Sequence, residues 1–136
     1  MTIRAVGIDL VGVAGFGEQL GSVGSAFAEA TFTAGELRAA SGSSGAAQHL
    51  AGRFAAKEAF VKAWSAGIYG CPPVVGEETV WASIEVVSDQ WNRPAISLYG
   101  DVAGAVAQSL GPVVTHVSLS HDGAFATATV VIEYAE

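Results

Sequence analysis

Positive charge is scarce in this chain of 136 residues. Six basic residues stand against thirteen acidic ones, which leaves a formal net charge of −7. Nonspecific binding to nucleic acid or to an anionic membrane depends on clustered Lys and Arg, so this charge balance argues against both. An anionic ligand would have to be bound by a local group of the few cations, which are Arg4, Arg38, Arg53, Lys57, Lys62 and Arg93.

Cysteine and long apolar runs are also missing. The single cysteine, Cys71, cannot form a disulfide within the chain and has no CxxC partner, which fits a reducing cytoplasm. No uninterrupted apolar run reaches the ~18–20 residues of a membrane-spanning helix. The apolar segment 3–16 is interrupted by Asp9 and lacks a signal-peptide cleavage site. We therefore expect a soluble cytoplasmic protein.

Small and apolar residues are abundant instead. Hydrophobic residues make up 51% of the chain and charged residues only 14%, so a disordered chain is excluded and the surface must be poor in charge. This deficit favours buried subunit contacts. The length suits one compact core that needs no disulfide or metal to fold, and we expect a single domain over residues 1–136.

The first third of the chain predicts one strand followed by weak helices. Residues 2–11 combine β-branched and apolar side chains, which predicts a buried strand. The GxxGxG run that begins at Gly12 should interrupt regular structure. Interior glycines leave 18–30 only weakly helical, because each costs about 1 kcal/mol relative to alanine. Thr33 and Glu36 form a TxxE capping box, which predicts the start of a short helix.

The rest of the chain predicts one long helix and an antiparallel sheet. Alanine dominates 46–66, where one glycine and no proline occur, so this segment should be the longest helix. A helix starting at an Asp101 N-cap and several strands are also predicted, the helix over 101–110 and the strands over 80–88, 94–99, 113–119 and 124–134. This order of elements indicates an α+β fold, with an antiparallel sheet packed on one long helix plus shorter helices.

Half of the basic residues fall within ten positions of the long helix, 53–62. They are Arg53, Lys57 and Lys62. In most helices such charges form solvated pairs with neighbouring carboxylates, which contribute little to stability. This helix is too apolar for a freely solvated face, so the cluster favours a functional site.

Two carboxylates in apolar surroundings also need an explanation. Asp9 lies in the first predicted strand, and Glu58 lies on an alanine-lined face of the long helix, four residues before Lys62. Two carboxylates brought together repel each other unless a cation joins them, and oxygen ligands together with substrate phosphates suit Mg²⁺. Lys62 and Arg53 would then hold the phosphates. The alternative is that Asp9 caps a turn and Glu58 pairs only with Lys62.

These residues lie in segments that resemble the holo-acyl-carrier-protein synthases, the small trimeric members of the 4′-phosphopantetheinyl transferases. The matching segments cover nearly the whole chain in the same order, and RFAAKEAFVKA is the most specific of them. They are VGIDLV at 6–11, AGRFAAKEAFVKAW at 51–64, SIEVV at 83–87, NRP at 92–94, SLSHD at 118–122 and AxAxVVIE at 126–133.

The resemblance implies the fold of that family and its reaction. The family transfers 4′-phosphopantetheine from coenzyme A to a serine of apo acyl carrier protein, which releases adenosine 3′,5′-bisphosphate and supports fatty acid biosynthesis. Mg²⁺ is the implied cofactor, and a homotrimer with sites at the subunit interfaces is the implied assembly. The alternatives are a coenzyme-A-binding paralogue without transferase activity and a structural module that forms trimers without binding coenzyme A.

The resemblance also implies roles for individual residues. Asp9 and Glu58 would bind the metal ion. Glu58 and Lys62 would be the catalytic residues, with Lys62 contacting the diphosphate and Glu58 receiving the serine proton directly or through a metal-bound water. The nucleotide side of coenzyme A would be contacted by Arg53, Asn92, Pro94, Ser120 and His121.

The implied carrier-binding segment departs from the family pattern. The first helix of these enzymes generally carries basic residues that dock an acidic carrier protein, but this chain has none from Val11 through Glu36. We therefore expect apolar contacts to contribute more to docking, with Phe16 and Phe27 as the candidates. The alternatives are that these phenylalanines belong to the core and that Arg38 and Arg93 supply docking charge from elsewhere.

Overall fold

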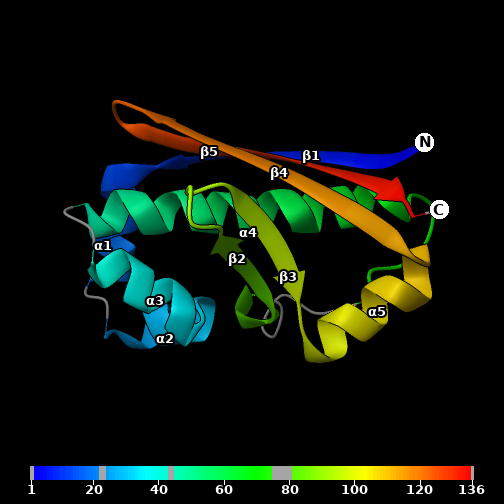
Figure 1. The fold of residues 1–136 in the computed structure, drawn as a ribbon, viewed down its shortest axis with the longest axis horizontal. Coiled ribbons are helices and arrows are strands. Elements are labelled where there is room, and N and C mark those ends of the chain that lie inside the picture. The colour runs from blue at the N-terminus through cyan, green and yellow to red at the C-terminus, as the bar shows by residue number, and fades with distance from the viewer. Residues whose placement is uncertain (1, 22–23, 43–44, 75–80, 136) are drawn as a thin grey trace.

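The computed structural model describes residues 2–21, 24–42, 45–74 and 81–135. A three-stranded antiparallel sheet lies across a long helix, α4 (Ala46–Gly67), and the strand order is β1 (Ile3–Gly12), β5 (Phe125–Tyr134), β4 (Val113–Asp122) (Figure 1). The other helices lie on the opposite side of α4, together with a 3₁₀ turn: α1 (Val13–Leu20), α2 (Ala26–Thr31), α3 (Ala34–Ser41), Trp81–Ser83 and α5 (Gly100–Leu110). The hairpin of β2 (Ile84–Ser88) and β3 (Pro94–Leu98) runs alongside α4, and β3 contacts β4 of the sheet. The predicted α+β architecture, with an antiparallel sheet on one long helix, is confirmed.

Small residues bring β1 and α4 unusually close together. Gly7 lies against the helix backbone, where an added Cβ would overlap the carbonyl oxygen of Ala59. Ala55, Ala59 and Ala63 are fully buried along the same helix. Strand β1 therefore packs against the alanine-lined side of α4. This contact brings the carboxylate of Asp9 to Lys62 of the helix.

The interior is divided into two apolar clusters. One includes Phe60 and Trp64 of α4 together with Ile132 of β5, and it lies between the sheet, α4 and α5. The other contains Phe16 and Leu50 and joins α1, α2 and α3 to the first half of α4. The short helices thus pack around one end of α4 and leave its other half to the sheet, β2 and α5.

The glycine-rich segment after the first strand is more regular than predicted. Helix α1 runs through Gly15 and Gly17, although these glycines disfavour helix. Phe16 and Leu20 of this helix are each only 4% exposed, and their burial outweighs the local preference. The burial also makes Phe16 part of the core, so its predicted role in direct docking is wrong.

Several predicted boundaries are shifted by one to four residues. Residues 81–83 form a 3₁₀ turn, so the strand begins at Ile84. Tyr99 occupies the N-cap of α5, and Asp101 lies in the first turn rather than at the cap. The last hairpin is tighter than expected, because β4 continues to Asp122 and β5 begins at Phe125. The capping box of Thr33 and Glu36 is confirmed.

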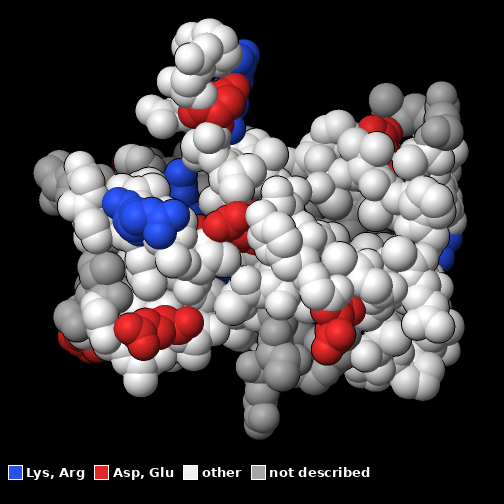
Figure 2. All heavy atoms as spheres, turned by 60° about the horizontal axis from the view of Figure 1, so that its bottom comes forward, with Lys and Arg blue, Asp and Glu red and all other residues white. Residues whose placement is uncertain are grey.

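The surface is poor in charge, as the composition requires. On the face shown in Figure 2, charged atoms form a few separate groups among mostly uncharged residues. In the described part of the chain, no helix is long and apolar enough to cross a membrane.

Candidate active site

Asp9 and Lys62 form the first part of the candidate site. The Nζ atom of Lys62 donates to Asp9 Oδ1 at 2.9 Å and to the carbonyl oxygen of Ile8 at 3.1 Å. The backbone carbonyl of Asp9 accepts a hydrogen bond from Thr127 Oγ1 at 2.7 Å, which ties β1 to β5 at this point. The Asp9 side chain is thus buried and held in place, whereas the Lys62 side chain is 58% exposed.

Lys62 is electrostatically prepared to bind an anion. The hydrogen bond with Asp9 is the main cause that raises the pKa of Lys62, and the negative charges of Asp9 and Glu58 add to it. The ammonium group therefore stays charged at neutral pH and still has access to solvent. Glu58 lies one helical turn before Lys62 on the same side of α4.

The oxygen donors here suit a hard divalent cation. Asp9 Oδ2 is buried and has no hydrogen-bond partner in the described part of the chain, which is costly for a carboxylate oxygen. The described residues contain no group of three acidic, His or Cys side chains that could bind a metal. Two carboxylates without further protein ligands fit Mg²⁺, which accepts water and substrate phosphates for the rest of its shell. The oxygen chemistry of the residues present therefore fits the metal that the resemblance implies, and Asp9 and Glu58 would hold it.

A second group of predicted residues lines two adjoining pockets farther along α4. One pocket has a volume of ≈ 240 Å³, and its lining includes Arg53, Ser120 and His121. The other has a volume of ≈ 190 Å³, and its lining includes Arg53, Asn92 and Pro94. Arg53 contributes to both. The structure thus brings together the five residues expected on the nucleotide side of coenzyme A.

The geometry of Arg53 and of the neighbouring turn is defined by local contacts. Arg53 Nη2 donates to Ser88 Oγ at 3.2 Å, and partial burial lowers the pKa of Arg53 without removing its charge. Asn92 adopts a left-handed conformation with φ of 63°, which Asn tolerates well. Asp89 Oδ1 accepts hydrogen bonds from two backbone N–H groups of this turn, those of Trp91 and Arg93, each at 2.9 Å.

The two groups of residues are separated along the helix. Arg53 and Lys62 are nine residues apart, which corresponds to about 13 Å at the helical rise of 1.5 Å per residue. Neither Asp9 nor Lys62 lines the two pockets. A ligand that contacts both groups must be extended, with an anionic part near Lys62.

Two residues have surroundings that the sequence interpretation missed. Lys57, counted in the basic cluster, is fully buried and forms an ion pair with Glu36 at 2.8 Å. His49, which the sequence segments did not single out, lines the pocket next to Arg53, and burial lowers its pKa, with the Arg53 charge as a smaller cause. The spacing of His49 and Arg53 places them on one side of the helix, and this was the available signal.

The fold and this arrangement agree with the comparison to known families. The model of the 4′-phosphopantetheinyl transferase superfamily matches residues 5–127. The chain belongs to this superfamily, as the sequence segments implied.

Relatives within the superfamily match nearly the whole chain. The holo-[acyl-carrier-protein] synthase of Corynebacterium glutamicum strain R is 50% identical over 131 residues, covering 94% of this chain and 96% of the relative. The enzyme of the same name from Mycobacterium tuberculosis is 49% identical over 134 residues, covering 98% of both chains. A solved structure described as the Chronobacterium ammoniagenes ACPS-CoA complex is 48% identical, with a TM-score of 0.89, and the match covers 97% of this chain and 98% of that one.

Proposed function

We propose that this protein transfers the 4′-phosphopantetheine group from coenzyme A to a serine of apo acyl carrier protein. The products are holo carrier protein and adenosine 3′,5′-bisphosphate. The relatives that match over nearly their full length carry the corresponding name, and the similar solved structure is described as a complex with coenzyme A. The alternative of a binding protein without transferase activity is not favoured.

The arrangement of two cationic groups along α4 carries this proposal. Arg53, with the turn of Asn92 and Pro94, would hold the nucleotide, and Lys62 would contact the diphosphate. An extended ligand with a diphosphate between its two ends matches that separation. Ser120 and His121, which share a pocket with Arg53, would contact the phosphate or the ribose.

The reaction follows from the residues near Lys62. The oxygen of the carrier serine attacks the phosphorus next to the pantetheine arm, and the bond from this phosphorus to the bridging oxygen breaks. The serine proton passes to the carboxylate of Glu58, and the Lys62 ammonium compensates the negative charge left on the departing nucleotide. The side chains thus act by positioning the substrate and by electrostatic stabilisation.

We propose Mg²⁺ as the cofactor, bound by Asp9 and Glu58. When bound, the ion neutralises charge on the phosphate oxygens. The protein's own contribution is a buried carboxylate, Asp9, whose Oδ1 is held by Lys62. Its Oδ2, which has no hydrogen-bond partner among the described residues, would bind the metal. Chelation with EDTA followed by addition of Mg²⁺ tests the cofactor: transfer should be lost and then recovered.

We propose a homotrimer, assembled through the outer face of the sheet, with the sites at the subunit interfaces. β1 exposes Val6, Ile8 and Leu10, at 53%, 62% and 63%, and no element covers this face of the sheet in Figure 1. An apolar surface of this kind marks an interaction site. Ile8→Glu should convert the trimer to monomers in sedimentation equilibrium, whereas a wild-type chain that is monomeric and active would contradict the assembly.

We also propose that residues 1–136 form a single domain that acts in the cytoplasm. Its partner is an apo carrier protein, free or within a larger synthase. The decisive experiment combines the purified protein with apo carrier protein, coenzyme A and Mg²⁺ and measures the mass of the carrier. We expect the mass of the phosphopantetheine arm to be added. A carrier that stays unmodified while coenzyme A binds would support the nontransferase alternative.

A further inference from the structure

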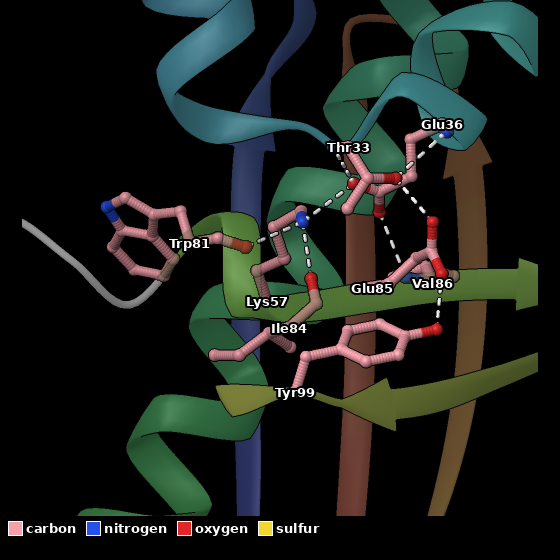
Figure 3. A network of polar contacts seen from close by, with 8 residues as sticks. All are labelled: Thr33, Glu36, Lys57, Trp81, Ile84, Glu85, Val86 and Tyr99. Atoms are coloured by element: carbon pink, nitrogen blue, oxygen red, sulfur yellow. Dashed lines mark hydrogen bonds and ion pairs between the residues drawn. The ribbon is translucent and has the colours of Figure 1, made fainter. Parts of the chain in front are cut away.

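A buried ion pair links α3 and α4 to the β2–β3 hairpin (Figure 3). Lys57 of α4 is fully buried, and its Nζ lies 2.8 Å from Glu36 Oε1 of α3. The same Nζ donates to the backbone carbonyl oxygens of Trp81, at 2.8 Å, and of Ile84. The ammonium of Lys57 therefore has three oxygen partners and no contact with water. None of these contacts has a role in the proposed reaction.

Glu36 completes this network from the other side. Its Oε2 accepts the backbone N–H of Val86 at 2.9 Å, and its Oε1 accepts that of Thr33 at 2.9 Å. The carboxylate thus accepts hydrogen bonds from the capping box of α3 and from strand β2 at the same time. Burial lowers the pKa of Lys57, and the nearby charge of Glu36 acts against this shift.

The two side chains occupy the position of a missing neighbouring strand. β2 pairs with β3 along one edge only. The carbonyl of Ile84 and the N–H of Val86 belong to alternate residues and so point to the same, opposite edge. Lys57 satisfies the first group and Glu36 the second. These directional bonds specify where β2 lies along α4, which an apolar contact would not do.

The hairpin held in this way forms one wall of the nucleotide pocket. Asn92 of its turn and Pro94, the first residue of β3, line the smaller pocket together with Arg53. Besides apolar packing, two side chains of α4 form hydrogen bonds with the hairpin: Lys57 binds the start of β2, and Arg53 binds Ser88 at its end. Arg53 and Lys57 are one helical turn apart, so both contacts depend on the same register of hairpin and helix.

A second layer of hydrogen bonds connects the network to the end of β3. Glu85 Oε2 accepts from Thr33 Oγ1 at 2.5 Å, and Glu85 Oε1 accepts from the hydroxyl of Tyr99 at 2.8 Å. Thr33 precedes α3, Glu85 lies in β2 and Tyr99 follows β3. Both strands of the hairpin are thus tied to the beginning of α3.

We propose that Glu36 and Lys57 are positioning residues that set the affinity for the nucleotide of coenzyme A. They hold the hairpin on α4, so that Asn92 and Pro94 stay opposite Arg53. Neither residue lines the pockets, and their effect is transmitted through β2. This inference rests on the proposed function, because it assigns the pocket to that nucleotide.

The first test asks whether two variants change the KM for coenzyme A without changing kcat. Lys57→Met keeps the length of the side chain but removes the charge and the donors, and Glu36→Gln keeps the shape of the carboxylate. We expect the KM for coenzyme A to rise at least about tenfold, since small misplacements remote from the chemistry can cost about 100-fold. The kcat and the KM for the carrier should stay within about twofold, because Lys62 is held by Asp9 and Ile8 of β1, which lies outside the network of Glu36 and Lys57.

Direct binding provides a second readout that does not require turnover. In calorimetric titrations with adenosine 3′,5′-bisphosphate, the Kd of each variant should rise relative to the wild type by the same factor as its KM for coenzyme A. If Lys57→Met does not fold, Glu36→Gln carries the test alone, since its amide oxygen can still accept one of the bonds that Glu36 makes. Unchanged Kd and KM in a folded variant would overturn the inference.

A matched control separates positioning from a general loss of stability. Val106→Ala removes buried apolar volume from α5, which takes no part in the pockets. This variant should lose stability and retain the wild-type KM for coenzyme A when assayed below its melting temperature. A tenfold rise in KM in this control as well would overturn the positioning role. A wild-type protein that does not modify the carrier would instead contradict the proposed function.

Discussion

Lys57 and Lys62 lie five residues apart on the same helix, yet their surroundings are opposite. The Lys57 side chain is fully buried among Glu36 and backbone carbonyls, whereas the Lys62 side chain is 58% exposed and forms an ion pair with Asp9. Lys57 faces the edge of β2, and Lys62 faces the end of β1. One lysine holds elements of the fold together, and the other remains available to a substrate. A cluster of charges in a sequence can therefore combine structural residues with site residues.

The difference also has an energetic side. A buried ammonium has lost its hydration, so it is tolerated only when its hydrogen-bond partners replace water completely. An exposed ammonium loses little hydration, and its pair with Asp9 contributes modestly to stability. Removing Lys57 should therefore affect folding most, and removing Lys62 should affect the reaction most.

Lys57→Ala, which removes the buried lysine, should produce the largest loss of folding stability. Truncation leaves the Glu36 carboxylate and the carbonyls of Trp81 and Ile84 without their partner, which costs about 3–5 kcal/mol in the free energy of unfolding. Urea denaturation followed by circular dichroism measures it. Lys62→Ala is the matched control and should cost less, because the Lys62 ammonium is exposed to solvent and loses little hydration on folding. Equal losses for the two lysines would refute the distinction.

Lys62→Ala should show the reverse pattern in activity. Loss of the cation that contacts the diphosphate should lower the transfer rate by at least about 100-fold, the range seen when one electrostatic contact to a developing charge is removed. The rate of mass gain of the carrier measures this effect, with a thermal melt of the same sample. Lys57→Met, assayed at saturating coenzyme A, should retain a kcat close to that of the wild type. Near-normal turnover of Lys62→Ala would remove Lys62 from the proposed reaction.

The double variant with Lys57→Met and Glu36→Leu measures how strongly the two buried charges depend on each other. Each single substitution leaves one buried charge unpaired, whereas the double substitution leaves none. We expect the double variant to be more stable than the sum of the single losses predicts, by about 0.5–3 kcal/mol of coupling. Backbone groups of β2 still lose their partners, so the double variant should stay below the wild type. Strictly additive losses would mean that the two side chains act independently.

The smallest expected effect concerns the pH dependence of Glu85. The hydrogen bond from Thr33, followed by that from Tyr99, holds the pKa of Glu85 below its ordinary value of 4.5. A lowered pKa in the folded state stabilises the protein above the ordinary value, and this contribution is lost as the pH falls through the folded-state pKa. Between about pH 6 and about pH 3, the melting temperature should therefore decrease less steeply with falling pH for Glu85→Gln than for the wild type. The same dependence of melting temperature on pH in both proteins would contradict the lowered pKa of Glu85.

Local sequence signals predicted those features that depend on near neighbours. The capping box of Thr33 and Glu36, the alanine-rich helix α4 and the left-handed turn at Asn92 all arise from contacts within about four residues. The motif segments correctly indicated the superfamily, because they preserve specific residues in a specific order. They also named Arg53 and the four residues that the structure gathers around it.

Contacts between distant residues decided the rest. Helix α1 forms despite Gly15 and Gly17, because Phe16 and Leu20 gain burial against residues far along the chain. His49 reaches the pocket only because β4 packs against the same side of α4. Propensity and pattern register short-range preferences. They place His49 and Arg53 on one side of the helix, but they show neither the burial of Phe16 and Leu20 nor the packing of β4 against that side.

The amino-acid sequence by itself determined that α4 carries three cations and that Asp9 lies in an apolar strand. The tertiary structure alone decided which cation is buried and which is available. Lys57 meets a carboxylate 21 positions earlier in the chain, and Lys62 meets one 53 positions earlier. Burial and ion pairing depend on such distant partners, and the distance between residues in space becomes defined only when the sheet, α3 and α4 pack together.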